Sequence, residues 1–229
     1  NSTLDENKFL LITTILISIL PAALLIGTLI SNSLLILICL FFLSHCFYKK
    51  DFSVFKNKIS LILYFFWFGL IINFIFSEIP QNSIGRVFGF VRFLILSISI
   101  FYIFNLRNII FKDIILKSWA ILFLIVIVDL LIEFIFGKNI LGYSSDYAGR
   151  LASFTGDELK IGNFFLAFSF IFIATVYDKI KNIKLLIFLI LIIIILGFLI
   201  GERANFIRLL LIANLFIFSL CIFKKKIKI

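Results

Sequence analysis

The sequence predicts an all-α protein, a polytopic transmembrane helical bundle of about eight membrane segments. Hydrophobic residues make up 63% of the 229 residues and charged residues 15%. A soluble domain must keep its surface wetted, so it has no place for this much apolar surface. The apolar residues also come in long runs separated by short polar stretches. Runs of about 20 apolar residues cross a bilayer as helices, because a helix satisfies its own backbone polar groups.

Eight apolar runs can be separated along the chain, and each is expected to form one membrane segment. The longest polar stretch, residues 137–160, is expected to form a loop, and residues 27–33 a short turn. No soluble domain stands out, so residues 1–229 are expected to form a single transmembrane domain. The expected segments are Phe9–Ile26, Leu34–Phe47, Ile59–Phe76, Ile84–Phe104, Ile114–Phe136, Ile161–Tyr177, Leu185–Ile200 and Ala204–Phe223.

The lysines of alternate loops predict how the chain is oriented in the membrane. Short cytoplasmic loops carry an excess of Lys and Arg. One alternate set of loops holds most of the lysines, including those of residues 49–58, 179–184 and 224–228, whereas residues 137–160 belong to the other set. An eight-span path therefore places both ends in the cytoplasm and residues 137–160 outside. The formal charge of +10 then reflects membrane orientation, and we expect no nucleic-acid partner.

The cysteine and histidine residues give no sign of a metal centre. Cys39, Cys46 and Cys221 lie in or beside apolar runs, and none has the paired spacing of a metal site. His45, the single histidine, is expected to be a partly buried residue at a helix end. We therefore expect neither a metal nor another cofactor. The chain contains no methionine, and we expect it to be the N-terminal portion of a longer protein.

The arginines are distributed differently from the lysines. Of six arginines, only Arg107 lies on the predicted inner side. The planar guanidinium group suits recognition of phosphate or carboxylate, so outward arginines near the bilayer surface favour a lipid-linked phosphate as ligand. Snorkelling of interfacial side chains is the alternative explanation. The candidate residues for binding a substrate diphosphate are Arg150, Arg203, Arg208 and Arg86.

Three charged residues are expected to pair inside the membrane. Arg92 and Asp129 lie within apolar runs, where an unpaired charge costs a few kcal/mol. Asp129 and Glu133 are four residues apart, on one face of a helix. Arg92 and Asp129 also lie at similar depth on antiparallel helices. We expect a buried ion pair of Arg92 with these carboxylates, and an acid–base role for Asp129 is the alternative.

Two glycine-containing stretches, residues 149–162 and 201–208, each lead into a predicted helix on the outer side. The first turn of a helix offers free N–H groups and the positive end of the helix dipole. Together with the nearby arginines, these helix starts are expected to form an anion site. Ordinary capping of the helices by Asp157, Glu158 and Glu202 is the alternative.

In this order, the segments resemble the superfamily of O-antigen ligases and Wzy-type O-antigen polymerases. The likeness covers the N-terminal part of the family pattern. It rests on four pieces of sequence: Asp129 with Phe136–Tyr143, Arg150 with Ser153–Asp157 and Gly162, Gly201-Glu202-Arg203, and Arg92.

The resemblance implies a glycosyltransferase of the bacterial inner membrane that needs no metal. Its donor would be a glycan linked to undecaprenyl diphosphate at the periplasmic face, and its acceptor lipid A-core, another glycan or a protein. Arg150 and Arg203 would bind the diphosphate. In the family the acceptor-activating histidine belongs to a later outer loop that this chain does not contain, so the catalytic base stays unassigned and this portion alone is expected to be inactive.

Two other classes of function compete with this interpretation. A transporter or flippase would be expected to show inverted repeats and helices broken by Gly or Pro near the midplane. Only Pro21 and Pro80 occur in the chain, and the charged residues of the apolar runs lie toward one face. A non-catalytic membrane subunit would use the same charges only for packing.

The predicted orientation can be tested by cysteine labelling in intact cells. With native cysteines masked, a Ser145→Cys protein should react with a membrane-impermeant thiol reagent, whereas Ser53→Cys and Asn182→Cys proteins should be shielded. Labelling at position 53 and not at position 145 would invert the topology.

Overall fold

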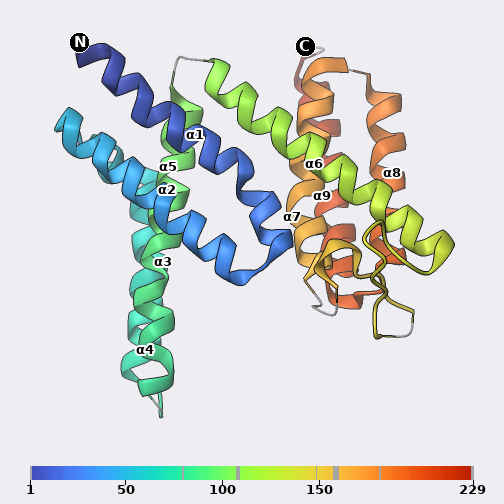
Figure 1. Ribbon diagram of the computed structural model, residues 1–229. Coiled ribbons are helices and arrows are strands. Elements are labelled where there is room, and N and C mark those ends of the chain that lie inside the picture. The colour runs from blue at the N-terminus through green and yellow to red at the C-terminus, as the bar shows by residue number, and fades with distance from the viewer. Residues whose placement is uncertain are drawn as a thin grey trace. The chain divides into compact units, whose positions relative to one another are not determined.

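All the regular secondary structure is helical in the part of the chain that the computed structural model describes (Figure 1). The described backbone covers residues 2–78, 80–106, 109–147, 149–156, 160–180 and 182–227. Within these ranges no strand forms, which confirms the all-α prediction there. The chain divides into two compact units, Asn1–Ile115 and Leu116–Ile229, and each is described by itself.

The apolar runs form the helices because lipid offers no hydrogen bonds to an open backbone. Among the described residues, five helical stretches are long and apolar enough to cross a membrane, and two shorter apolar helices follow. Most ends of the expected segments lie within a few residues of an observed helix end. The structure divides residues 84–104 between two helices, and the count of eight spans stays a prediction. The five candidate spans are Lys8–Ile26, Thr28–Lys49, Lys58–Ile75, Ser83–Asn105 and Ile109–Phe136, and the shorter helices are Ile161–Tyr177 and Lys184–Leu199.

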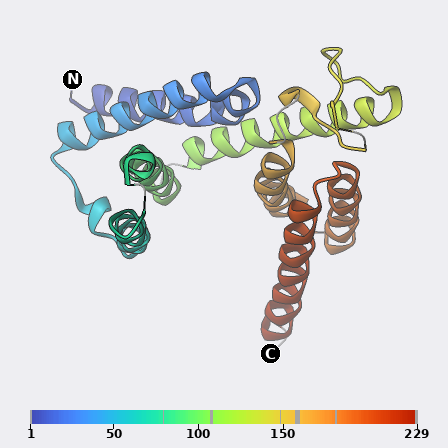
Figure 2. The ribbon, with the colours of Figure 1, turned by 90° about the horizontal axis from the view of Figure 1, so that it is seen from below.

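In the first unit, α1 (Ser2–Ile26) and α2 (Thr28–Lys49) pack as a hairpin (Figures 1 and 2). Gly27 alone separates them, with φ 155° and ψ 167°, a backbone region that is open essentially only to glycine. The expected turn over residues 27–33 and the expected start of the second segment at Leu34 are therefore wrong. Ser31 is helical instead, and its hydroxyl donates to the Thr28 carbonyl at 3.1 Å.

The remaining helices of the first unit are α3 (Lys58–Ile75), α4 (Pro80–Gly89) and α5 (Val91–Asn105), preceded by the short 3-10 helix η1 (Ser53–Lys56). The expected segment 84–104 is thus divided at Phe90, although the Phe90 N–H still donates to the Arg86 carbonyl at 3.0 Å. Trp67 links α3 to α4 by donating its indole N–H to the Val87 carbonyl at 3.0 Å. The buried core cluster of this unit contains Phe42, Cys46, Val54 and Ile98.

The second unit packs α7 (Ile161–Ile180), α8 (Ile183–Leu199) and α9 (Arg203–Ile227) against one another (Figure 2). Helix α6 (Ile109–Phe136) begins earlier than the expected Ile114 and joins this core through aromatic side chains. The Phe123 ring centroid lies 5.2 Å from that of Phe165 and 5.5 Å from that of Phe172 on α7. The loop after α6 contains the 3-10 helix η2 (Ser153–Thr155).

The turn between α8 and α9 requires glycine. Gly201 has φ +80°, and a Cβ at this position would lie 2.5 Å from the carbonyl oxygen of Gly149 and 3.1 Å from Cγ of Arg150. The α8–α9 turn and the loop that follows α6 therefore meet backbone to backbone.

We expect Gly201→Ala to lower the stability of the protein. The substitution adds a strained backbone conformation, which costs about 1–3 kcal/mol, and a clash with main-chain atoms. Thermal unfolding in detergent measures the effect. Gly85→Ala is the matched control, because a Cβ at Gly85 in α4 meets no atom within 4 Å. An unchanged melting temperature for Gly201→Ala would contradict this packing.

Candidate functional site

Two buried carboxylates on α6 hold the loop that follows this helix. The side chains of Asp129 and Glu133 are 0% and 3% exposed. Glu133 accepts hydrogen bonds from the backbone N–H of Ala152 at 3.0 Å and from that of Ser153 at 2.6 Å. Asp129 accepts from the N–H of Ile140 at 2.8 Å and from the Ser153 hydroxyl at 2.6 Å. Ile140 near the start of the loop and Ala152 and Ser153 further along it are therefore fastened to the last turns of α6.

Asn139 completes this anchor from inside the loop, a role that was not predicted from the sequence although Asn139 lies in one of the motifs that resemble the family. Its side-chain oxygen accepts from the N–H of Leu141 at 3.0 Å and of Tyr143 at 2.8 Å. Its amide nitrogen donates to the Ser153 carbonyl at 2.6 Å. The available signal was the asparagine shortly before Gly142, since asparagine often bonds to the backbone of a turn that it starts.

Ser153 also lies in one of the motifs that resemble the family, but its structural role was not predicted from the sequence. Its backbone adopts φ 50°, which is unfavourable for a residue other than glycine, and it is fully buried. The bonds from Asp129, Glu133 and Asn139 hold it in this conformation. No pattern in the sequence marks a serine for a positive φ, because the conformation results from partners elsewhere in the chain.

The expected ion pair of Arg92 with Asp129 and Glu133 stays a prediction, because Arg92 belongs to the first unit. There its guanidinium carbon lies 5.1 Å from the ring centroid of Phe93, and its carbonyl accepts a hydrogen bond from the Cys39 thiol at 3.3 Å. The two carboxylates meanwhile have the loop partners just described.

The loop brings Arg150 to the α8–α9 turn. The Leu151 N–H donates to the Ile200 carbonyl at 3.3 Å, and the missing side chain of Gly201 gives room to Gly149 and Arg150. The guanidinium carbon of Arg150 lies 5.6 Å from the ring centroid of Tyr147, a distance typical of a cation–π contact.

A groove of about 1160 Å³ opens at this junction, and Arg150 and Arg203 both line it. Two of the arginines expected to bind a diphosphate are therefore brought together, from segments more than fifty residues apart. The rest of the lining is mainly backbone and apolar side chains. It consists of Phe134, Gly149, Phe198, Leu199, Gly201, Glu202, Ala204, Phe206 and Ile207.

The other two expected ligands lie elsewhere. Arg208 is not among the groove-lining residues, and its Nη1 donates to Oδ1 of Asn205 at 3.3 Å. Arg86 lies in the last turn of α4 in the first unit, where it is exposed, and its expected role stays a prediction.

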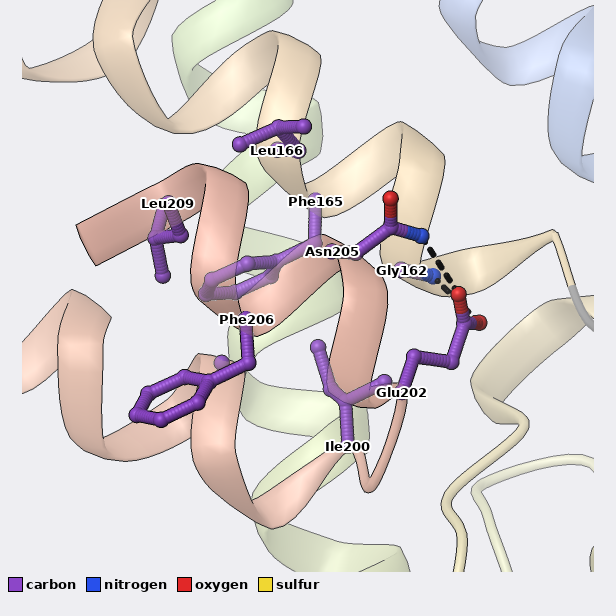
Figure 3. Close-up of a pocket in the computed structure, with 9 residues that line it drawn as sticks. Gly162, Phe165, Leu166, Ile200, Glu202, Asn205, Phe206 and Leu209 are labelled. Atoms are coloured by element: carbon purple, nitrogen blue, oxygen red, sulfur yellow. Dashed lines mark hydrogen bonds between the residues drawn. The ribbon is translucent and has the colours of Figure 1, made fainter. Parts of the chain in front are cut away.

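Glu202 reaches from the α8–α9 turn to the start of α7 (Figure 3). One carboxylate oxygen accepts from the Gly162 N–H at 3.0 Å, and the other accepts from the Asn205 amide. Glu202 therefore caps a helix start, as the alternative interpretation held, but the helix is α7. The N–H of Gly162 is consequently occupied by the protein's own carboxylate. Asp157 and Glu158 lie outside the described residues.

A cavity of about 10 Å³ lies beside this contact, lined by residues such as Phe165, Ile200 and Leu209 (Figure 3). Its volume is at the lower limit for holding one water molecule. Across the described ranges, no group of three or more His, Cys, Asp and Glu side chains is arranged to hold a metal ion.

Comparisons of the chain with protein-family models, with curated proteins and with solved structures find no match. The function is therefore argued from the groove and from the residues around it.

We expect Glu133→Ala to loosen the loop that carries Arg150. The substitution leaves the buried N–H groups of Ala152 and Ser153 without an acceptor, and each such loss costs about 1–3 kcal/mol. A lower melting temperature should be accompanied by faster hydrogen exchange in residues 137–156. Glu78→Ala is the control at an exposed acidic residue. It should change neither the melting temperature nor the rate of hydrogen exchange in residues 137–156. Unaltered exchange in the Glu133→Ala loop would show that the carboxylate does not anchor it.

Proposed function

We propose that the chain is part of a membrane glycosyltransferase of the O-antigen ligase and polymerase type. Its donor is a glycan linked to undecaprenyl diphosphate, used at the periplasmic face of the bacterial inner membrane, and its acceptor is lipid A-core or another glycan. The observation that carries the proposal is the groove in which Arg150 and Arg203 lie together.

The two guanidinium groups suit the diphosphate of such a donor. In the reaction an acceptor hydroxyl attacks the anomeric carbon, and the bond from this carbon to the diphosphate oxygen breaks with its electron pair. Negative charge grows on the diphosphate as it leaves, and donors placed in advance around that charge lower the barrier. Arginine can donate two parallel hydrogen bonds to a phosphate. The base that takes the hydroxyl proton is not assigned in this chain.

The apolar part of the groove suits a donor with a lipid chain. Phe134, Phe198 and Ile207 line it and are 55%, 66% and 58% exposed. Ligand sites commonly combine a mainly apolar lining with a few polar groups that fix orientation. A substrate with an anionic head and an apolar chain matches both parts of this lining.

The eight-span topology with both ends in the cytoplasm belongs to the same proposal. Helices α7 and α8 have 20 and 17 residues, which correspond to lengths of about 30 and 26 Å at the rise of an α-helix. These lengths are close to the thickness of the hydrocarbon core, about 30 Å. If α7, α8 and α9 all span, Arg150 and Arg203 lie on the same outer side.

The proposal predicts that Arg150→Ala and Arg203→Ala each reduce glycan transfer by roughly a hundredfold, the usual effect of removing one donor to a developing anion. Arg203→Lys should also be impaired, because lysine keeps the charge but loses the planar fork. Transfer is measured with the complete gene in cells that lack the native enzyme, with protein levels checked by blot.

Arg107→Lys, at the predicted inner side, is the matched control and should transfer glycan normally. Full transfer by Arg150→Ala and Arg203→Ala proteins that accumulate normally would remove the basis of the proposal.

A further inference from the structure

The groove that contains Arg150 and Arg203 is also lined by a carboxylate, that of Glu202. A negative charge there would be expected to weaken the binding of an anion. Glu202 also directly precedes Arg203 in the sequence. A carboxylate within reach of a guanidinium ordinarily forms a charge-assisted pair with it. Such a pair would neutralise the group that must bind the substrate.

The structure gives this carboxylate other hydrogen-bond partners. Its two oxygens accept from the Gly162 N–H and from the Asn205 amide. Among the residues that the structure describes, no ion pair joins Arg150 or Arg203 to a carboxylate. The partial positive charge at the start of α7 stabilises the Glu202 carboxylate in place of a guanidinium.

The place that the Glu202 carboxyl group occupies is left open by the absence of a side chain at residue 162. A Cβ at Gly162 would overlap the Glu202 carboxyl group. On the other side, Asn205 is itself held, because its side-chain oxygen accepts from Nη1 of Arg208 at 3.3 Å. A continuous set of contacts thus runs from Arg208 through Asn205 and Glu202 to the backbone of α7.

We infer that Glu202 is a positioning residue. By binding the start of α7, it fixes the turn that carries Arg203 and leaves both groove arginines available for the substrate anion. Arg208 acts through Asn205 in the same set of contacts and does not itself contact the anion. This inference rests on the proposed function, because it concerns the same groove.

The inference can be tested through the sign of a change in affinity. Removing a negative charge beside an anion site strengthens anion binding if the charge acts only through space. A positioning role predicts the opposite, because the turn loses its attachment. The full chain in detergent micelles is titrated with farnesyl diphosphate, a probe with a diphosphate and an apolar chain, and the dissociation constant is measured.

Glu202→Ala should weaken binding of the probe about tenfold, the cost of losing a fixed charge-assisted contact. Asp146→Ala is the matched control, since it removes an exposed acidic residue of the outer loop and should bind the probe as tightly as the unmodified chain or more tightly. Glu202→Gln keeps the acceptor for the Gly162 N–H but loses the one for the Asn205 amide, so its affinity should lie between those of Glu202→Ala and the unmodified chain. Glu202→Ala binding as tightly as Asp146→Ala would overturn the inference.

Gly162→Ala provides the second arm, and it replaces the first if Glu202→Ala fails to fold. It displaces Glu202 without changing any charge, so the probe should bind several-fold more weakly. Alanine forms helix more readily than glycine, so a weaker affinity would not result from a weaker helix. Gly85→Ala is the control and should leave the affinity for the probe unchanged. Undiminished binding by folded Gly162→Ala would also overturn the inference. Failure of the proposed function looks different, since Arg150→Ala and Arg203→Ala would then leave probe binding unaltered.

Discussion

The bonds from the Glu133 carboxylate to the N–H groups of Ala152 and Ser153 are the interaction on which the rest of the site depends. Buried polar groups need partners, and a carboxylate that accepts several N–H bonds satisfies many at once. Once this part of the loop is fixed, the Leu151 N–H meets the Ile200 carbonyl. Gly201 then lies against the loop backbone, and the two arginine-bearing segments form one groove.

The carboxylates and the arginines around the groove have different kinds of partner. The carboxylates of Asp129, Glu133 and Glu202 all accept from backbone N–H groups of other segments. Arg150 and Arg203 line the groove instead. This division keeps acid and base apart although Glu202 and Arg203 are neighbours in the sequence. Under the proposed function, the acidic residues hold the loop and the turn in place, and the two arginines bind the substrate anion.

The helices could be predicted from the sequence because lipid makes a long apolar run helical whatever its neighbours are. The turn after α1 was predicted too long, since Ser31 and its neighbours are typical of turns in water but bond within the helix here. Arg150 and Arg203 could be selected because their position opposed the lysine pattern. The partners of Glu133 could not be predicted from the sequence. Every residue except proline has a backbone N–H, so no residue type indicates which N–H groups a carboxylate will bind.

Because almost every residue type has a backbone N–H, the attachment of the loop after α6 bears on how this loop can evolve. The hydrogen bond from the Ile140 N–H to Asp129 does not involve the Ile140 side chain, which is 54% exposed. Substitutions at such positions can alter the exposed surface of the loop while the attachment to α6 persists. Proline is the exception, because it has no N–H to donate. The exposed side chains of this loop can therefore vary while its attachment to α6 is kept, and proline at the attached positions is the change that selection should remove.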